Sequence, residues 1–335
     1  MPGPDPDPPA GRDTGRGMRV CLMIEGQEGV GWEQWLALAR ACEDAGLEGL
    51  FRSDHYTSIL AAGERGSLDA WATLAGLATQ TERIRLGTLV SPTTFRHPST
   101  LAREAATVDH ISNGRVELGL GAGWYELEHT ENGFPFPELG TRLEVFAEQL
   151  EIVHRQWTED VFDYAGRHYE LTECRALPRP VQKPRPPLIV GGIAQAGTIG
   201  PAVRFADEYN TFFASAQTCS ERRRRLVEAC EKADRDPATL TFSLMTTCIV
   251  GRDRDHLLDN ARRVMRVRDS EHSDPAAFLS DAEDSWIVGT VDEVAEQLHA
   301  LEEVGVERIM LQHLDHEDLA TIELLGKELL PRAGR

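Results

Sequence analysis

Residues 84–129 read IRLGTLVSPTTFRHPSTLAREAATVDHISNGRVELGLGAGWYELEH. Two short apolar runs, Ile84–Val90 and Arg115–Leu120, flank the amphipathic segment Pro98–Ile111, a pattern that predicts strand, helix, strand. Because a helix joins the two strands, they must lie parallel, and their carboxyl ends meet at one edge of the sheet. Ligands bind at that edge in parallel α/β folds, so the residues after each strand are the first candidates for a site.

The same alternation of strand and helix patterns continues along the chain. Strands are expected at residues 18–24, 50–51, 84–90, 115–120, 188–190, 206–213, 240–250 and 308–314. A doubly wound Rossmann fold is the rival interpretation, but its GxGxxG fingerprint follows the first strand. Here the glycine run follows the fourth strand, and Trp124 occupies the place of the third glycine. We therefore predict an α/β fold of the TIM-barrel type, a (β/α)8 barrel with insertions.

The chain divides into a short tail and one domain. Residues 1–17 carry five prolines and no apolar core, so they predict a disordered tail and not a secretory signal. Residues 18–335 form a single barrel domain in this interpretation. An excursion at about residues 159–187 contains a hairpin-like piece, Phe162–Leu171, and a proline-rich link.

Composition excludes several classes of partner. The net charge is −20, from 35 basic and 55 acidic residues, which argues against nucleic acid or an anionic membrane surface. No apolar run approaches the ~20 residues of a membrane helix. The six cysteines lack a CxxC pair, so we expect neither a disulfide framework nor a metal site. We expect a cytoplasmic protein that acts on a small molecule.

One candidate for proton transfer follows the second strand. Asp54 and His55 are adjacent there, and a carboxylate beside an imidazole at a barrel mouth can orient it for acid–base work. The alternative is a surface loop in which Asp54 caps a turn and His55 has no catalytic role.

Two glycine-rich stretches are candidates for ligand contact. After the fourth strand, Gly121 and Gly123 would let a ligand approach the backbone, with Trp124 as an aromatic wall. The alternative is a strand kink at a barrel corner.

The second stretch, Gly191-Gly192-Ile193, precedes a helix that has Gly197 and Thr198 in its first turn. Backbone N–H groups and the positive end of that helix could hold a phosphate. A double glycine before a helix is also common in ordinary turns, so both interpretations stay open.

Six short segments carry a family resemblance. They are FRSDHY (51–56), LGTLVSPTTFRHPSTLA (86–102), GRVELGLGAGWYELEH (114–129), PPLIVGG (186–192), RFADEYN (204–210) and VGTVDEVAEQLHALEEVGVERIML (288–311). In this order and spacing the chain resembles the bacterial luciferase-like monooxygenase superfamily, within it the branch that uses the deazaflavin coenzyme F420. The resemblance runs from Met18 to about Leu330 and implies a TIM barrel.

The resemblance implies roles for particular residues. His55 would contact the cofactor or the reacting atoms, with Asp54 beside it. The Leu89–Val90 bond falls where the family often carries a non-prolyl cis peptide that backs the flavin ring, and Ser91 is implied as a cofactor contact beside it. Further cofactor contacts are implied for Gly121, Ala122, Gly123, Gly191, Gly192, Ile193, Gly197 and Thr198.

The substrate side is implied less completely. Trp124, His129 and Trp286 would line the substrate pocket. Relatives that oxidise glucose 6-phosphate carry a glutamate at the position of Trp124, so sugar-phosphate oxidation is not expected. Many relatives also place Ser, Gly, Lys or Arg after the double glycine, whereas this chain has Ile193-Ala194, which leaves the phosphate to backbone groups and Thr198.

Three functions follow as alternatives. The first is an F420-dependent oxidoreductase that moves a hydride between the deazaflavin and a small organic substrate, with His55 oriented by Asp54 for the proton. The second is a monooxygenase of the same fold that uses reduced FMN. The third is a non-catalytic flavin-binding barrel. Family members usually pair through barrel helices, so a homodimer is expected.

Overall fold

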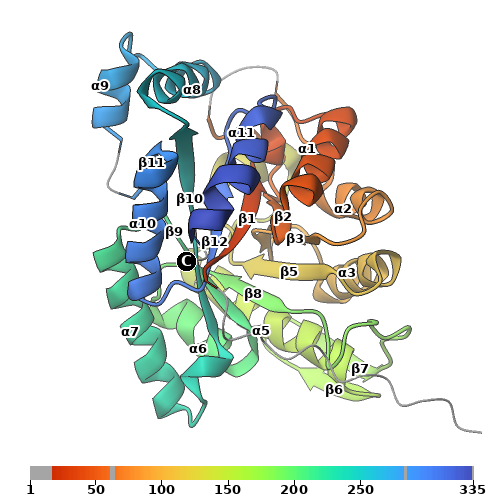
Figure 1. Cartoon of the computed structure of the whole chain (residues 1–335). Helices are drawn as coiled ribbons and strands as arrows, with labels where there is room; N and C mark the ends of the chain where they lie inside the picture. Colours follow the sequence, from red (N-terminus) through yellow and green to blue (C-terminus); the bar gives the residue numbers. More distant parts are fainter. Residues whose placement is uncertain (1–16, 61–64, 283–284, 334–335) are drawn as a thin grey trace, which may run out of the picture.

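Eight parallel strands close into a barrel with helices around it (Figure 1). The computed structural model describes residues 17–60, 65–282 and 285–333. The strands follow the order β12, β1, β2, β3, β5, β8, β9, β10, and β10 pairs back onto β12. Their bounds are Arg19–Ile24 (β1), Gly49–Arg52 (β2), Arg85–Thr88 (β3), Val116–Gly121 (β5), Leu188–Gly191 (β8), Glu208–Phe212 (β9), Thr241–Gly251 (β10) and Arg308–Gln312 (β12). The predicted barrel is confirmed.

The crossover that decides the fold is formed as predicted. β3 and β5 pair in parallel, and α3 (Pro98–Ser112) joins them. The strand expected to reach Val90 ends at Thr88, where the chain turns through a cis peptide bond between Leu89 and Val90. A two-residue strand, β4 (Ser91–Pro92), then pairs with the end of β5. The carboxyl ends of the barrel strands, here called the mouth, therefore lie on one side of the molecule.

Amphipathic helices cover the outside of the barrel. In α5 the apolar side chains Phe146, Leu150, Val153 and Trp157 recur every three or four residues, and all four are buried. The other helices are α1 (Trp32–Ala45), α2 (Ala70–Ala78), α4 (Glu126–Asn132), α6 (Ala196–Phe205), α7 (Ala216–Lys232), α8 (Arg254–Val267), α9 (Pro275–Ser280), α10 (Val291–Glu303), α11 (Leu319–Leu324) and α12 (Leu330–Ala333), with α5 spanning Leu139–Thr158. Short 3-10 turns lie at Gly26–Glu28 and Pro237–Thr239, and a π-helical turn at Leu325–Leu329.

Two additions lie outside the barrel cycle. β6 (Phe162–Ala165) and β7 (Glu170–Cys174) form a separate antiparallel hairpin, at the lower right of Figure 1. β11 (Ile287–Thr290), which the sequence did not predict, pairs with the far end of the long strand β10. The N-terminal tail predicted to be disordered lies outside the described residues, apart from residue 17.

The core has an outer and an inner layer. On β1, Leu22 and Ile24 belong to the large cluster between strands and helices, whereas Cys21 and Met23 belong to a second cluster inside the barrel. The second cluster consists of Cys21, Met23, Phe51, Leu89, Ile189 and Met310. This alternation fixes which side chains of each strand point into the barrel, and so which ones reach the mouth.

All six cysteines are free, and five of them are buried. In the part of the chain that the structure describes, no helix combines the length and the apolar composition that a membrane crossing requires.

Candidate functional site

His55 leaves the end of β2 and is held by a carboxylate that the sequence did not indicate. Its Nδ1 lies 2.8 Å from Oε1 of Glu128, and the other oxygen of Glu128 accepts a hydrogen bond from the Tyr56 backbone N–H at 3.1 Å. Glu128 lies in α4 and is buried. Among the described residues none bonds the second ring nitrogen of His55, Nε2. The ring of Trp124 packs edge-on against the imidazole, with 5.7 Å between centroids.

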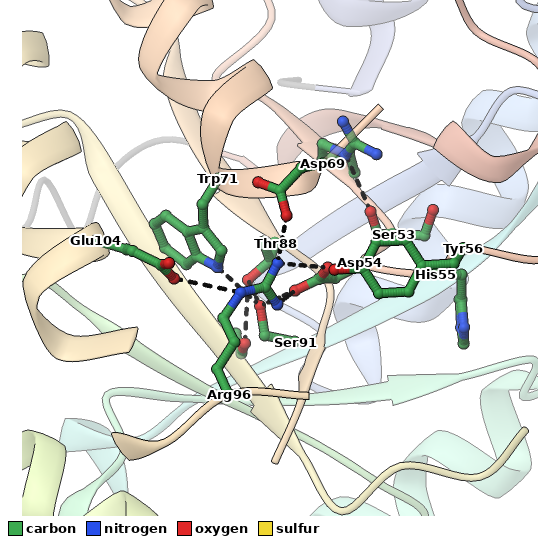
Figure 2. Close-up of polar contacts among 12 residues, drawn as sticks. Ser53, Asp54, His55, Tyr56, Asp69, Trp71, Thr88, Ser91, Arg96 and Glu104 are labelled. Carbon is green, nitrogen blue, oxygen red and sulfur yellow. Dashed lines mark hydrogen bonds and ion pairs between the residues drawn. The ribbon is translucent and has the colours of Figure 1, made fainter. Parts of the chain in front are cut away.

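Asp54 does not orient His55, so that prediction is wrong. Figure 2 shows Asp54 directed toward Arg96 while the His55 ring points away. Oδ2 of Asp54 accepts hydrogen bonds from Arg96 Nη1 and from Ser91 Oγ, both at 2.6 Å. The two adjacent side chains leave the backbone in different directions, so Asp54 faces Arg96 while His55 faces Glu128. Asp54 instead ties the end of β2 to the segment that follows the cis peptide.

Asp54, Ser91 and Arg96 form a hydrogen-bonded group, here called the clamp. This group occupies the Ser91 side chain, which was expected to contact the cofactor. Its hydroxyl lies between Asp54 and the indole N–H of Trp71, which donates to it at 3.1 Å, and the residue is fully buried. Arg96 also binds Asp69 at 2.8 Å and Glu104 at 3.3 Å (Figure 2). Ser91 therefore shapes the site through the backbone it holds and not through its own hydroxyl.

The charge state of His55 depends on Glu128. Burial alone would lower the pKa of His55, but the hydrogen bond and negative charge of Glu128, together with the charges of Glu25 and Asp54, outweigh burial and raise the pKa. A raised pKa keeps more of the imidazole protonated near neutral pH, so His55 can donate as well as accept a proton there.

We expect Glu128→Gln to lower the pKa of His55. The amide keeps the size of the side chain but removes the negative charge and the charged hydrogen bond, which are the main contributions that raise the pKa. NMR titration of the histidine ring protons without any cofactor measures this. Glu126→Gln, which removes an exposed carboxylate from the same helix, is the control. A His55 pKa that stays constant or rises in Glu128→Gln would show that Glu128 does not set it.

A hydrogen-bond belt crosses four adjacent strands at the mouth, and sequence reasoning missed it. Thr247 donates to Gln312 at 2.6 Å, and Gln312 donates to Glu25 at 2.6 Å. From the other side, Ser53 donates to Gln27 at 2.5 Å and Gln27 donates to Glu25 at 2.8 Å. The polar run that directly follows the apolar strand β1 was a usable signal, because polar residues at the carboxyl ends of barrel strands often belong to the site.

The wall of the mouth opposite the hydrogen-bond belt is formed by the ends of β3, β5 and β8. Three glycines on β5 and β8 leave space there for the side chain of Val90. A Cβ added to Gly121 would lie 2.6 Å from Val90 Cγ2, and one added to Gly119 or Gly191 would lie 2.9 or 3.1 Å from Val90 Cγ1. Gly121 was predicted to let a ligand approach the backbone and Gly191 to help to hold a phosphate, but the space beside both is filled by the valine side chain. Val90 and the cis peptide bond next to it form an apolar shelf at the mouth.

The neighbouring residues differ in their surroundings. Ala122 packs against the outer core cluster, which turns its side chain away from the mouth. Gly123 adopts φ 79°, where an L side chain is strained, and a Cβ there would meet the Thr94 hydroxyl at 3.1 Å. Ala122 and Gly123 therefore shape the turn into α4 that carries Glu128.

The loop after β8 has the backbone form of an anion site. Gly192 precedes α6, and a Cβ on it would lie 2.5 Å from the Tyr209 hydroxyl. That hydroxyl accepts a hydrogen bond from Ala194 N–H at 2.8 Å and shares one with Thr198 Oγ1 at 2.7 Å. The N-cap residue of α6, Gln195, caps no helix N–H with its side chain. The first turn is thus free of side-chain caps, the arrangement that suits an oxyanion.

Other predicted residues of this loop have separate positions. Ile193 is partly exposed, with 37% of its surface open to solvent. A Cβ on Gly197 would meet Leu143 of α5 at 2.7 Å, so this glycine allows α5 and α6 to pack closely. Gly197 therefore has a packing role in this structure.

Of the three predicted substrate residues, Trp124 is the most exposed, with 62% of its surface open to solvent. His129 is fully buried, and its ring nitrogens bind the Tyr125 carbonyl and the Thr94 hydroxyl, both at 2.6 Å. That prediction is wrong, because α4 directs His129 inward, one residue after Glu128. Trp286 packs against Phe278 and under Arg268. Trp286 packs against a third apolar cluster, which includes Phe278 and Leu314, and none of its described ring contacts is with His55.

Comparison with known proteins places this geometry in a family. The family model "Luciferase-like monooxygenase" matches residues 18–308. An F420-dependent glucose-6-phosphate dehydrogenase of Amycolatopsis mediterranei is 26% identical over 87% of this chain and 91% of its own length. The pyrimidine monooxygenase RutA of Pseudomonas savastanoi pv. phaseolicola is 31% identical over 64% of this chain and 58% of its own length.

A solved structure shares the fold over almost the whole chain. An F420-dependent secondary alcohol dehydrogenase, solved with an F420-acetone adduct, superposes with a TM-score of 0.79 over 95% of this chain and 100% of its own, at 18% identity. The family match begins at the first barrel strand and reaches the start of the last one, so it covers nearly the whole barrel. The chain belongs to the luciferase-like monooxygenase family.

Proposed function

We propose that this protein is an oxidoreductase that transfers a hydride between coenzyme F420 and a small organic substrate. The observation that carries the proposal is His55, which is held by Glu128 through Nδ1 and has Nε2 without a partner among the described residues. At the same mouth, the Val90 shelf and the glycines of β5 and β8 form an apolar wall. A proton-transferring group beside a surface for a flat ring is what such a reaction requires.

The residues present fit a deazaflavin. Its phosphate would bind the free N–H groups of the first turn of α6. Gly192 has no side chain, so its backbone can lie close to Tyr209 and Thr198, which are hydrogen-bonded to each other. Its ring would lie against Leu89 and Val90. When bound, the deazaflavin supplies a two-electron hydride carrier; the protein supplies position, exclusion of water and the proton.

His55 would handle the proton that accompanies the hydride. Glu128 fixes the imidazole through Nδ1, so only Nε2 can face a reacting group. The raised pKa lets the ring donate that proton in one direction of the reaction and accept it in the other. Trp124, edge-on to the imidazole and exposed, would cover the substrate from the rim of the mouth.

Relatives support the choice of cofactor without deciding it. The Amycolatopsis relative and the secondary alcohol dehydrogenase are both named as F420-dependent. RutA, named as a monooxygenase, favours the second candidate, a reduced-FMN monooxygenase on the same barrel. An anaerobic titration of the protein with F420 and with FMN tests the proposal, since the two candidates predict opposite preferences.

We expect Gly192→Ala to weaken F420 binding by at least about tenfold, because one lost charged hydrogen bond already has that size. The added Cβ would lie 2.5 Å from the Tyr209 hydroxyl and 3.0 Å from Thr198 Oγ1, so the loop must shift away from α6. Gly200→Ala is the matched control. Gly200 lies in α6, and nothing lies within 4 Å of a Cβ added there. Fluorescence titration of F420 compares the two variants. Equal affinities in Gly192→Ala and Gly200→Ala would place the phosphate elsewhere.

Sugar-phosphate oxidation is not part of the proposal. The position that follows the β5 glycines holds the indole of Trp124, which offers no carboxylate for acid–base work.

We also propose a cytoplasmic homodimer. The free cysteines suit a reducing compartment, and dimers are usual in the family. Sedimentation equilibrium would give about twice the chain mass of 37.2 kDa, and a single-chain mass would contradict the dimer.

A further inference from the structure

Glu25 is the centre of the hydrogen-bond belt at the mouth. It lies two residues after Met23, which points into the barrel, so the alternation of β1 directs Glu25 inward as well. The same spacing holds on the adjacent strands. Ser53 and Gln312 follow Phe51 and Met310, two members of the cluster inside the barrel, by two positions, and Thr247 follows Met245, which packs against that cluster, by two positions.

All donors in the belt are directed toward this one carboxylate. Thr247 donates to Gln312 and Gln312 to Glu25, while the Gly26 N–H donates to Ser53, Ser53 to Gln27 and Gln27 to Glu25. Each Glu25 oxygen receives one amide hydrogen bond, at 2.6 and 2.8 Å. An ionised carboxylate can accept about four hydrogen bonds, so about two of its acceptor sites remain for a ligand.

The part of the opposite wall that the structure describes is mainly apolar. β3, β5 and β8 present the Val90 shelf and the glycines against it. The exposed aromatic side chains Trp124 and Phe212 add apolar surface at the rim. His55 lies near enough to Glu25 for the carboxylate charge to act on the imidazole. The mouth thus has an apolar wall on one side and the buried carboxylate of Glu25 on the other.

We propose that Glu25 determines substrate specificity by accepting a hydrogen bond from a hydroxyl or amino group of the substrate. The substrates would be mainly apolar compounds that carry an alcohol or an amine beside the reacting carbon. Carboxylates and phosphates at the same place would meet a fixed negative charge and be excluded. This inference rests on the proposed function for the reaction itself, but the binding preference can be measured separately.

The test uses three probes that share one ring: cyclohexanol, cyclohexylamine and cyclohexanecarboxylate. Their dissociation constants are measured by ligand-observed NMR, with and without F420, for the wild type, Glu25→Gln and Glu126→Gln. The wild type should bind the alcohol and the amine at least about tenfold more tightly than the carboxylate, since a like charge at a contact costs several kcal/mol. Glu25→Gln should remove most of that difference, and Glu126→Gln, which removes an exposed carboxylate of α4, should keep it.

Two further measurements distinguish a misfolded variant, a wrong proposed function and a wrong role for Glu25. If Glu25→Gln does not fold, Glu25→Asp keeps the charge but withdraws it from Gln27 and Gln312, and the preference should still decrease. F420 titration of the wild type tests the proposed function alone. The inference is overturned if the wild type binds the carboxylate as well as the amine, if it binds none of the probes, or if the preference survives unchanged in the Glu25 variants.

Discussion

Replacing Arg308 with methionine is expected to lower the free energy of unfolding by about 3–5 kcal/mol, the usual effect of removing one partner from a buried ion pair. The Arg308 side chain is 2% exposed and lies inside the barrel, at the amino ends of the strands. Its guanidinium binds Glu117 at 2.7 Å, Glu208 at 2.9 Å and Glu48 at 2.7 Å. Methionine matches the length of the side chain but leaves Glu208 without an ion-pair partner among the described residues, and leaves Glu117 and Glu48 only with Arg85 and Arg19, respectively.

The loss of unfolding free energy in Arg308→Met should depend on pH. Burial alone raises the pKa of Glu117, but Arg308 and Arg85 outweigh burial and lower the pKa from 4.5 to about 2. A lowered pKa contributes stability that is present above the unfolded-state value and is lost as the pH falls toward 2. Without Arg308 much of this contribution is absent at neutral pH. The difference in stability between wild type and variant should therefore be largest near pH 7 and shrink below pH 4.5.

Denaturant unfolding of both proteins across this pH range measures the effect. Arg204→Met is the matched control, because Arg204 is 66% exposed and lies 3.5 Å from Glu151 in a surface pair of small expected value. If Arg308→Met cost no more than Arg204→Met, the buried cluster would not stabilise the barrel.

Replacing His55 with glutamine is expected to reduce the rate of hydride transfer by about 10²–10⁴, the range for loss of a general acid or base. F420 affinity should change little, because the phosphate and ring contacts proposed for the cofactor come from β3, β8 and α6. The measurement is the change in F420 absorbance during single turnover with any substrate that the wild type accepts.

His110→Gln provides the control for this experiment. His110 is exposed at the end of α3, and its described side-chain bond goes to the Arg179 carbonyl at 2.7 Å. The control should turn over at the wild-type rate. A His55→Gln enzyme as fast as the control would remove His55 from the reaction.

The fold was predictable because its signals are local. Each barrel strand is a short apolar run, each helix has an apolar stripe, and the rule that a helical crossover joins parallel strands fixes the arrangement. β11 could not be predicted in this way, since Ile287–Thr290 is short and forms a strand only because the end of β10 extends past the barrel to pair with it.

The site was only partly predictable. His55 and the double glycine after β8 could be found from their positions at strand ends. The partner of His55 could not, because Glu128 is 73 residues away in sequence and meets it only through the path of α4. Adjacency favoured Asp54, but the opposite directions of neighbouring side chains give Asp54 to Arg96. Val90 likewise fills space that the glycine pattern alone assigned to a ligand.

The stretch from Ile84 to His129 therefore contributes loop and helix residues to the site in addition to its two strands. It supplies the Val90 shelf, Arg96 of the clamp, Trp124 at the rim and Glu128. His55, Glu25 and the loop after β8 come from outside it and complete the mouth.

Anaerobic equilibrium titration of the wild-type protein with F420 and with FMN, followed by fluorescence, tests the central claim most directly. We expect saturable binding of F420 with a dissociation constant in the micromolar range or below, at least about tenfold tighter than that of FMN. We also expect Gly192→Ala to weaken this binding by at least about tenfold and Gly200→Ala to leave it unchanged. Tight binding of FMN with no binding of F420 would contradict the claim and favour the monooxygenase.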